Sequence, residues 1–178
     1  MVATVAPYFH FFMMKDSPMK RASTLFLKIV VVLIGASVLI ACGFLFPHLW
    51  VVVPRELPEY TYVIYPGLIG FNATLIPFLF ALYQALKLLH YIDTNNAFSE
   101  LSIQALRNIT FSAIAMSVLY WTCMPLVFVF ADLDDAPGAI LIGAAIACSP
   151  LIVATFAAVL EKLVQSALDM KRENDLTV

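Results

Sequence analysis

Charged residues are scarce in this chain. They make up 12% of its 178 residues, whereas a soluble domain of this length carries about a quarter. Long stretches hold no charge at all, and hydrophobic residues reach 62%. This deficit is typical of a protein whose solvent is lipid. The formal net charge of −2 excludes the basic surface that direct nucleic-acid binding requires.

Cysteine and glycine are also few. Cys42, Cys123 and Cys148 are widely spaced in apolar runs, a pattern that indicates neither a disulfide framework nor a metal site. The six glycines form no phosphate-binding loop, and no histidine lies beside a nucleophile or a carboxylate in a catalytic arrangement. We therefore expect a protein that is not an enzyme and that holds no cofactor or metal.

What the sequence does contain is four long apolar segments. A spanning helix needs about 20 mostly apolar residues, because the hydrocarbon core is roughly 30 Å thick and each helical residue adds about 1.5 Å. Backbone groups in lipid must bond within their own segment, so each segment is predicted to be helical. The predicted spans are residues 25–46, 62–86, 109–130 and 138–160. The predicted fold class is all-α, an integral membrane four-helix bundle in one domain of residues 23–178.

Residues 1–22 are predicted to be a lead-in to the first span. Their apolar part precedes the positive charges and no small-x-small cleavage site follows, so they do not form a signal peptide. Pro7 and the crowded aromatic and methionine side chains indicate a poorly structured or interfacial segment. Met13, Met14 and Met19 are alternative start positions, and a start at Met19 gives the beginning MKRASTLFLKI.

Lysine and arginine are unevenly distributed about the predicted spans. Nine of the ten lie before span one or near its start, between spans two and three, or after span four, and the tenth, Arg55, follows span one. Loops on the cytoplasmic side carry the excess of these residues. We therefore expect a multi-pass protein of a bacterial cell membrane, with its N-terminus and C-terminus in the cytoplasm.

Three carboxylates crowd the predicted outside loop ADLDDAPG, residues 131–138. Asp134 and Asp135 can accept hydrogen bonds from the first N–H groups of the fourth helix, and Pro137 suits its first turn. Carboxylate oxygens also suit calcium or magnesium, although the spacing matches no ordered calcium loop. A helix-capping turn is the favoured interpretation. The alternative is an external cation sensor built on Asp132, Asp134 and Asp135 and completed from the other outside loop.

Pro66 and Pro77 interrupt the second predicted span, with Asn72 between them. A broken helix with a polar residue at membrane depth is one signature of a transporter substrate site. Spans two to four hold no acidic or basic side chain away from their ends, whereas a transporter is expected to carry one. The favoured interpretation is a kinked helix whose Asn72 bonds to a neighbouring helix. A small transporter or channel subunit, assembled as a homo-oligomer, is the alternative.

Small residues recur at every fourth position of the fourth span. They are Ala139, Gly143 and Ala147. Such a stripe lets another helix approach closely, so we expect span four to be a packing helix. Pro125 and Pro150 are predicted to kink spans three and four.

Two amphipathic segments are predicted to extend the bundle into the cytoplasm, at residues 97–107 and 161–172. Asn95 or Asn96 can cap the first helix, which would begin near Ala97. The apolar stripes are Phe98, Leu101, Ala105 and Ile109 in the first, and Leu160, Leu163, Val164, Ala167 and Leu168 in the second. Such stripes pack against each other, lie on lipid or hold a partner protein, and the mixed charge argues against lipid adhesion. The candidate partner-binding residues are Phe98, Leu101, Leu163, Leu168, Asp169 and Arg172.

Four stretches together resemble a known family. They are MKRASTLFLKI, AFSELSIQALRNI, ADLDDAPG and FAAVLEKLVQSALDMKRENDLTV, and they are similar to small bacterial membrane proteins of the domain of unknown function 2975 family. The similarity covers about Met19 to Val178, and its most specific part is the C-terminal ALDMKRENDLTV.

The resemblance implies a four-span integral membrane protein without established activity or catalytic residues. Members of the family are often encoded beside a very small helix-turn-helix protein of the Cro/repressor type. This implies a regulatory role, in which the protein holds or modulates a small helix-turn-helix transcription regulator at the cytoplasmic face of the bilayer.

Overall fold

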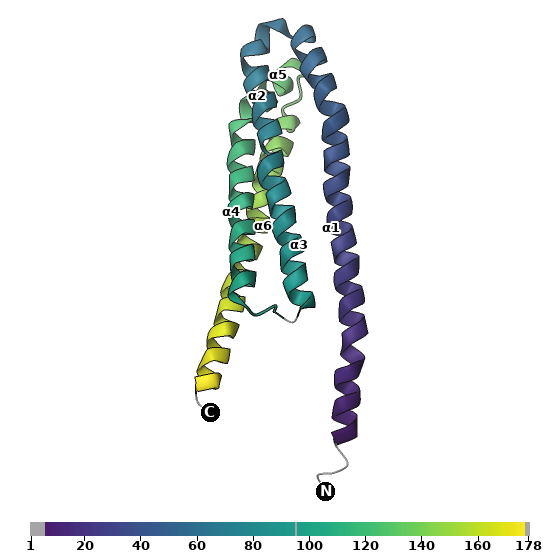
Figure 1. Ribbon diagram of the computed structural model, residues 1–178. Coiled ribbons are helices and arrows are strands. Elements are labelled where there is room, and N and C mark those ends of the chain that lie inside the picture. The colour runs from purple at the N-terminus through teal and green to yellow at the C-terminus, as the bar shows by residue number, and fades with distance from the viewer. Residues whose placement is uncertain (1–5, 95, 177–178) are drawn as a thin grey trace.

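The computed structural model describes the backbone of residues 6–94 and 96–176 and the side chains of residues 24–94 and 96–174. All regular structure in these ranges is helical (Figure 1). The elements are α1 (Ala6–Glu56), a short 3₁₀-helix (Pro58–Tyr60), α2 (Thr61–Ala73), α3 (Leu75–Asp93), α4 (Glu100–Thr122), α5 (Met124–Leu133) and α6 (Gly138–Leu176).

Four helical stretches are long and apolar enough to cross a membrane. They are Thr24–Glu56, Pro58–Asp93, Glu100–Leu133 and Gly138–Asn174. Each contains one of the four predicted spans and is longer than it. The prediction of an all-α, four-helix membrane architecture is confirmed.

Proline explains why the second stretch consists of two helices. Pro77 has no N–H, and its ring crowds the carbonyl of Ala73, four residues earlier, so a regular helix cannot pass through this point. The chain breaks at Thr74, between α2 and α3. Thr74 is buried, and its hydroxyl donates a 2.6 Å hydrogen bond to the carbonyl of Phe71. This bond satisfies a backbone acceptor at the break without water.

The third stretch breaks in the same way, but the fourth does not. α4 and α5 are separated at Cys123, two residues before Pro125. Pro150, in contrast, lies inside the uninterrupted helix α6. Pro66 likewise lies inside the uninterrupted helix α2, so the prediction that it interrupts the second span is wrong, and a proline in these spans does not always divide the helix.

The core lies where α4 and α6 pack along each other (Figure 1). Ala113 of α4 and Ala147 of α6 are buried almost completely. These small side chains let the backbones approach, so the Ser117 hydroxyl donates a 2.7 Å hydrogen bond to the Ala147 carbonyl of the other helix. Gly143 is equally close to α5, because an added Cβ would lie 2.9 Å from Cγ1 of Val127. The predicted small-residue stripe is thus a packing surface at Gly143 and Ala147.

α1 stands at the edge of the bundle, against α3 and α2 (Figure 1). Lys28 forms an ion pair with Asp93, which ties α1 to the end of α3. Near the other end, the Trp50 and Tyr65 rings lie 6.0 Å apart between centroids. Most large apolar side chains of α1 are exposed, as expected for a helix that faces lipid on most sides.

The backbone of α1 begins at Ala6, which differs from the poorly structured lead-in predicted for residues 1–22. Pro7 lies in the first turn of the helix, where a missing N–H costs nothing and the fixed φ angle suits the start. The proline that indicated irregular structure therefore begins a helix instead. Residues 1–5 lie outside the described part of the chain.

Candidate functional site

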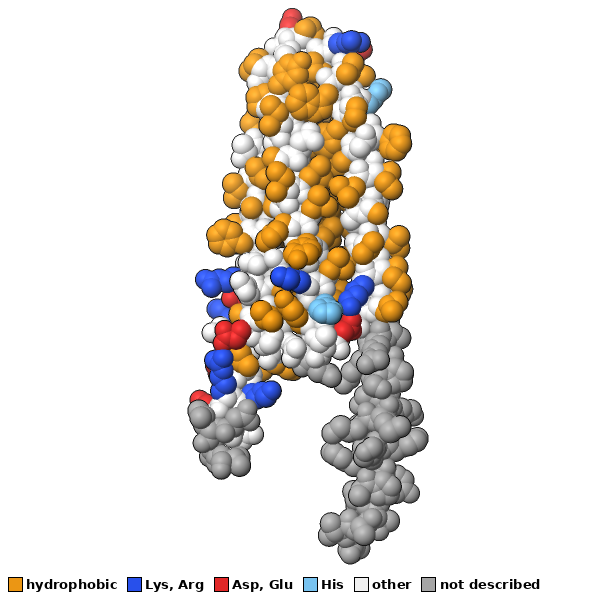
Figure 2. Space-filling view, viewed as in Figure 1, with side chains coloured by type: hydrophobic (Ala, Val, Ile, Leu, Met, Phe, Trp, Pro, Cys, Tyr) orange, Lys and Arg blue, Asp and Glu red, His pale blue; other side chains and the backbone are white. Residues whose placement is uncertain are grey.

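The first residue of α1, the α3–α4 loop and the last residue of α6 lie at the same end of the bundle (Figure 1). We call this the terminal end. On the face shown in Figure 2, apolar side chains cover the middle of the molecule and most basic side chains gather toward the terminal end. The basic residues with described side chains there are Lys28, Lys87, Arg107, Lys162, Lys171 and Arg172.

Ser99 caps α4 at the terminal end. Its Oγ accepts a 3.4 Å hydrogen bond from the backbone N–H of Ser102, and the Ser102 hydroxyl donates a 3.0 Å hydrogen bond to the carbonyl of Asn96. The predicted cap at Asn96 is wrong, and Asn95 lies outside the described residues. Serine is as good a cap as asparagine, and here Glu100 follows it directly and complements the positive end of the helix.

Three residues in the first two turns of α4 are buried. Ser102, Ala105 and Leu106 face the interior, whereas Phe98 and Leu101 are 60% and 51% exposed. The predicted apolar stripe of Phe98, Leu101, Ala105 and Ile109 is thus exposed at its first two members and buried at Ala105, and partner binding by Phe98 and Leu101 stays a prediction. Ser102 can be buried because its hydroxyl and its N–H both have partners in the loop and cap.

The end of α6 is held to α4 by an ion pair. Arg172 Nη2 contacts Glu100 Oε1. Both side chains are mainly exposed, so this contact is worth at most about 1 kcal/mol and serves mainly to orient α6. Leu168 is half-buried on this extension, and Asp169 is exposed. Leu163 is 61% exposed, so mutual packing of the two extensions leaves apolar surface uncovered.

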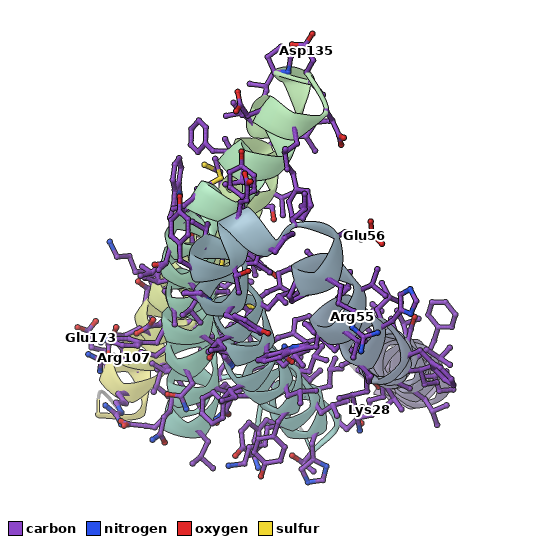
Figure 3. All side chains as sticks on the ribbon, turned by 90° about the horizontal axis from the view of Figure 1, so that it is seen from above. Lys28, Arg55, Glu56, Arg107, Asp135 and Glu173 are labelled. Carbon is purple, nitrogen blue, oxygen red and sulfur yellow. The ribbon has the colours of Figure 1, made fainter. Side chains whose placement is uncertain are left out.

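Some of this apolar surface lies near the terminal ends of α4 and α6. Leu101 precedes Arg107 by six positions on α4, and Met170 follows Lys162 by eight positions on α6 and directly precedes Lys171. At a rise of about 1.5 Å per residue these offsets are about 9 and 12 Å. Arg107 and Glu173 also lie on the same side of the bundle in the view from above (Figure 3). The terminal end thus presents exposed Phe98, Leu101 and Met170 on the side away from the spans.

Asn72 lies at the kink of the second stretch. Its Nδ2 donates a 3.1 Å hydrogen bond to the carbonyl of Leu68, one turn earlier in the same helix. The predicted bond to a neighbouring helix is wrong, because the carbonyl four residues earlier is within reach of the side chain. This amide is half-buried and already engaged by its own backbone.

The three aspartates of ADLDDAPG end α5 and do not cap α6. The Ala136 N–H donates to the Ala131 carbonyl at 2.9 Å, and the Asp135 N–H donates to the Asp132 carbonyl. Asp135 has a φ of 48°, so the helix closes with the left-handed residue of a Schellman motif. Aspartate tolerates this conformation better than most residues. The prediction that Asp134 and Asp135 accept bonds from α6 is wrong, since the Ala139 and Ile140 N–H groups of α6 donate to the carbonyls of Ala136 and Pro137.

No group of three His, Cys, Asp or Glu residues that could hold a metal ion occurs in the described part of the chain. Asp135, between α5 and α6, and Glu56, the last residue of α1, lie well apart in the view from above (Figure 3). The structure therefore offers no support for the cation-sensor alternative.

Asp135→Gly is expected to raise the free energy of unfolding by about 0.5–1 kcal/mol, because glycine adopts a positive φ without steric cost. The change is measured as a higher midpoint of thermal unfolding in detergent. Asp134→Gly is the matched control, since Asp134 has an ordinary φ of −92°. A rise in both variants, or in neither, would contradict this account of the turn.

The chain matches the family model described as "Protein of unknown function (DUF2975)" over residues 48–178. It is 49% identical over 160 residues to the "Uncharacterized membrane protein YoaS" of Bacillus subtilis (strain 168), an alignment that covers 90% of this chain and 100% of that protein. No solved structure matches the chain. On the strength of the family match and the four apolar helices, this chain is a membrane protein that belongs to the DUF2975 family.

Proposed function

We propose that this protein is a non-enzymatic regulatory protein of the bacterial cell membrane that holds a small helix-turn-helix transcription regulator at the terminal end. The excess of Lys and Arg at that end supports its placement in the cytoplasm. The observation that carries the proposal is the exposure of Phe98, Leu101 and Met170 at the terminal end.

Apolar side chains that are exposed at this position are stabilised when another surface buries them. Within the spans, lipid covers apolar side chains, but beyond the hydrocarbon core the solvent is water. An amphipathic helix of a partner fits such a surface through apolar contacts at helical spacing. The partner would supply the DNA-binding charge that this chain, with a net charge of −2, lacks.

A transport role has less support. Its main candidate, Asn72, uses its amide within its own helix, so it does not offer that donor to a substrate.

Signal transmission in the regulatory proposal needs no pore. A shift in packing between α4 and α6 would move Glu100 and Arg172, which join the two helices at the terminal end.

The test is crosslinked affinity purification from native membranes, with mass spectrometry of the recovered proteins. The double variant Phe98→Glu with Leu163→Glu is expected to lose a small helix-turn-helix protein by more than tenfold, because apolar anchors carry most of the energy of an interface. The matched control is Gln165→Glu with Ser166→Glu, two exposed positions on α6. Equal recovery from both double variants, or recovery of no such protein from the parent, would overturn the proposal.

A further inference from the structure

Two depressions follow the seam between α3 and α4. Near the terminal end lies a cavity of about 90 Å³, which we call the polar cavity. Farther into the spans lies a more open groove of about 500 Å³, which we call the apolar groove. Asn108 lines both, so the polar cavity and the apolar groove adjoin at this residue.

The residues that line this seam change from apolar to polar at the same level on both helices. The lining residues recur every three or four positions on each helix, so each set forms one face. In the groove they are Ala73, Ile76, Pro77 and Phe80 on one side and Phe111, Ser112, Ala115 and Leu119 on the other. In the cavity the polar residues are Gln84, Lys87 and Tyr91 on one side and Gln104 and Asn108 on the other. The change from apolar to polar thus falls between Phe80 and Gln84 on α3 and at Asn108 on α4.

Gln84 is the buried polar group of the cavity. Its side chain is 5% exposed, and it makes no hydrogen bond to any other described residue. No described side-chain nitrogen or oxygen is fully enclosed without a partner, so the Gln84 amide is open to the cavity that it lines. Burial of a carboxamide without a partner is costly. A ligand with hydrogen-bond acceptors would remove this cost.

Lys87 is the charged residue among those that line the cavity, and it is exposed to solvent. Its Nζ lies 5.7 Å from the centroid of the Tyr83 ring, a contact that favours a cation. The neighbouring carboxylates are already engaged, since Asp93 pairs with Lys28 and Glu100 with Arg172. Lys87 therefore has no ion-pair partner among the residues with described side chains, and the cavity favours an anion.

The apolar groove has the length of one leaflet. From Asn108 to Leu119 it covers eleven positions of α4, or about 16 Å at the helical rise. Half of the hydrocarbon core is about 15 Å. The Ser112 hydroxyl donates to the Asn108 carbonyl in its own helix, so this hydroxyl is not a free donor in the wall of the groove. Such a groove fits an acyl chain whose head group lies at Asn108.

We propose that the α3–α4 seam binds one anionic glycerophospholipid from the leaflet nearer the terminal end. The Lys87 ammonium and the Gln84 and Asn108 amides donate to the phosphate oxygens, and one acyl chain lies in the apolar groove. Basic pockets between spanning helices are known to receive lipid head groups in this way. A free phosphate ion would use the cavity and leave the groove empty. This inference does not depend on the proposed protein partner.

The test measures lipid binding to the purified full chain in mild detergent, by native mass spectrometry and by thermal shift. The probes are phosphatidylglycerol, phosphatidylcholine with the same acyl chains, and inorganic phosphate. The parent is expected to bind one phosphatidylglycerol at least tenfold more tightly than phosphatidylcholine. Lys87→Gln and Gln84→Leu are each expected to weaken this binding about tenfold, the usual effect of losing a hydrogen bond to a charged group. Ala115→Phe fills the groove and is expected to weaken it as much.

Matched controls separate these effects from general damage. Lys162→Gln removes an exposed charge from α6, and Ala145→Phe adds a ring to an exposed position of α6, so neither is expected to alter binding. Folding of each variant is checked by protection of the buried Cys123 thiol. Equal binding of the two lipids, or equal losses in the site variants and their controls, would overturn the proposal. So would stabilisation by inorganic phosphate equal to that by phosphatidylglycerol, with no effect of Ala115→Phe.

Discussion

Gly67→Leu is expected to lower the free energy of unfolding by about 3 kcal/mol, at the upper end of the range for overpacked cores. A Cβ at this position would lie 2.8 Å from Leu126 Cδ2 and 3.0 Å from Leu126 Cβ. The Cβ of Leu126 cannot move without its backbone, so α5 must shift away from α2. The shift also lengthens the contact in which the Cys123 thiol donates to the Gly67 carbonyl at 3.6 Å. The loss is therefore larger than a rotamer change alone would cause.

The loss is measured by the reactivity of the Cys123 thiol during thermal unfolding in detergent. Cys42 and Cys148 are replaced by alanine in all samples, so Cys123 is the remaining thiol. Gly43→Leu is the matched control, because nothing lies within 4 Å of a Cβ built at Gly43. Both changes add the same apolar side chain to a spanning helix, so they favour insertion equally. Equal unfolding midpoints for the two variants would contradict the close packing of α2 on α5.

Ala147→Leu is expected to cost about 2–3 kcal/mol, again through overpacking. Ala147 is 1% exposed and lies where the Ser117 hydroxyl crosses from α4 to the Ala147 carbonyl. A leucine side chain here must push the two helices apart. The separation also breaks this interhelical bond, which contributes about 0.6 kcal/mol on average in membrane proteins.

The control for this change is two positions away. Ala145 is exposed on the same helix, so Ala145→Leu adds the same side chain to the lipid-facing side and is expected to leave stability nearly unchanged. Denaturant titration in mixed micelles compares the two. Equal losses of stability from Ala145→Leu and Ala147→Leu would contradict the close packing of α4 on α6.

The terminal end and the lipid site differ in how far the sequence could predict them. Leu163, Asp169 and Arg172 could be assigned to an amphipathic extension because their helical spacing is visible in the chain. The buried positions at the start of α4 could not be assigned, because the sequence does not show which polar residue caps the helix. Ser99 is the cap, so α4 begins three residues later than predicted from Asn96. Ser102 was missed because polarity alone argues for exposure, and only its loop partners permit burial.

The polar cavity was not predicted at all. Gln84 and Asn108 are 24 positions apart and lie on different helices, so no local pattern connects them. One signal was available. A glutamine near the end of an apolar span, followed three positions later by Lys87, indicates a polar group that must find a partner at the edge of the hydrocarbon. Which residues of α4 line the cavity with it was decided by how α3 and α4 pack.

The sequence by itself determined the class of this protein and its number of spans. Lipid leaves the backbone no partner outside its own segment, so long apolar runs must become helices whatever their neighbours are. Only the tertiary structure decided the contacts between those helices. The breaks at Thr74 and Cys123, the burial of Gly67 and Ala147 and the cavity at Gln84 all depend on groups distant in sequence. Between apolar helices in lipid the hydrophobic effect does not favour one arrangement over another. The fit of small side chains and a few hydrogen bonds therefore set the arrangement.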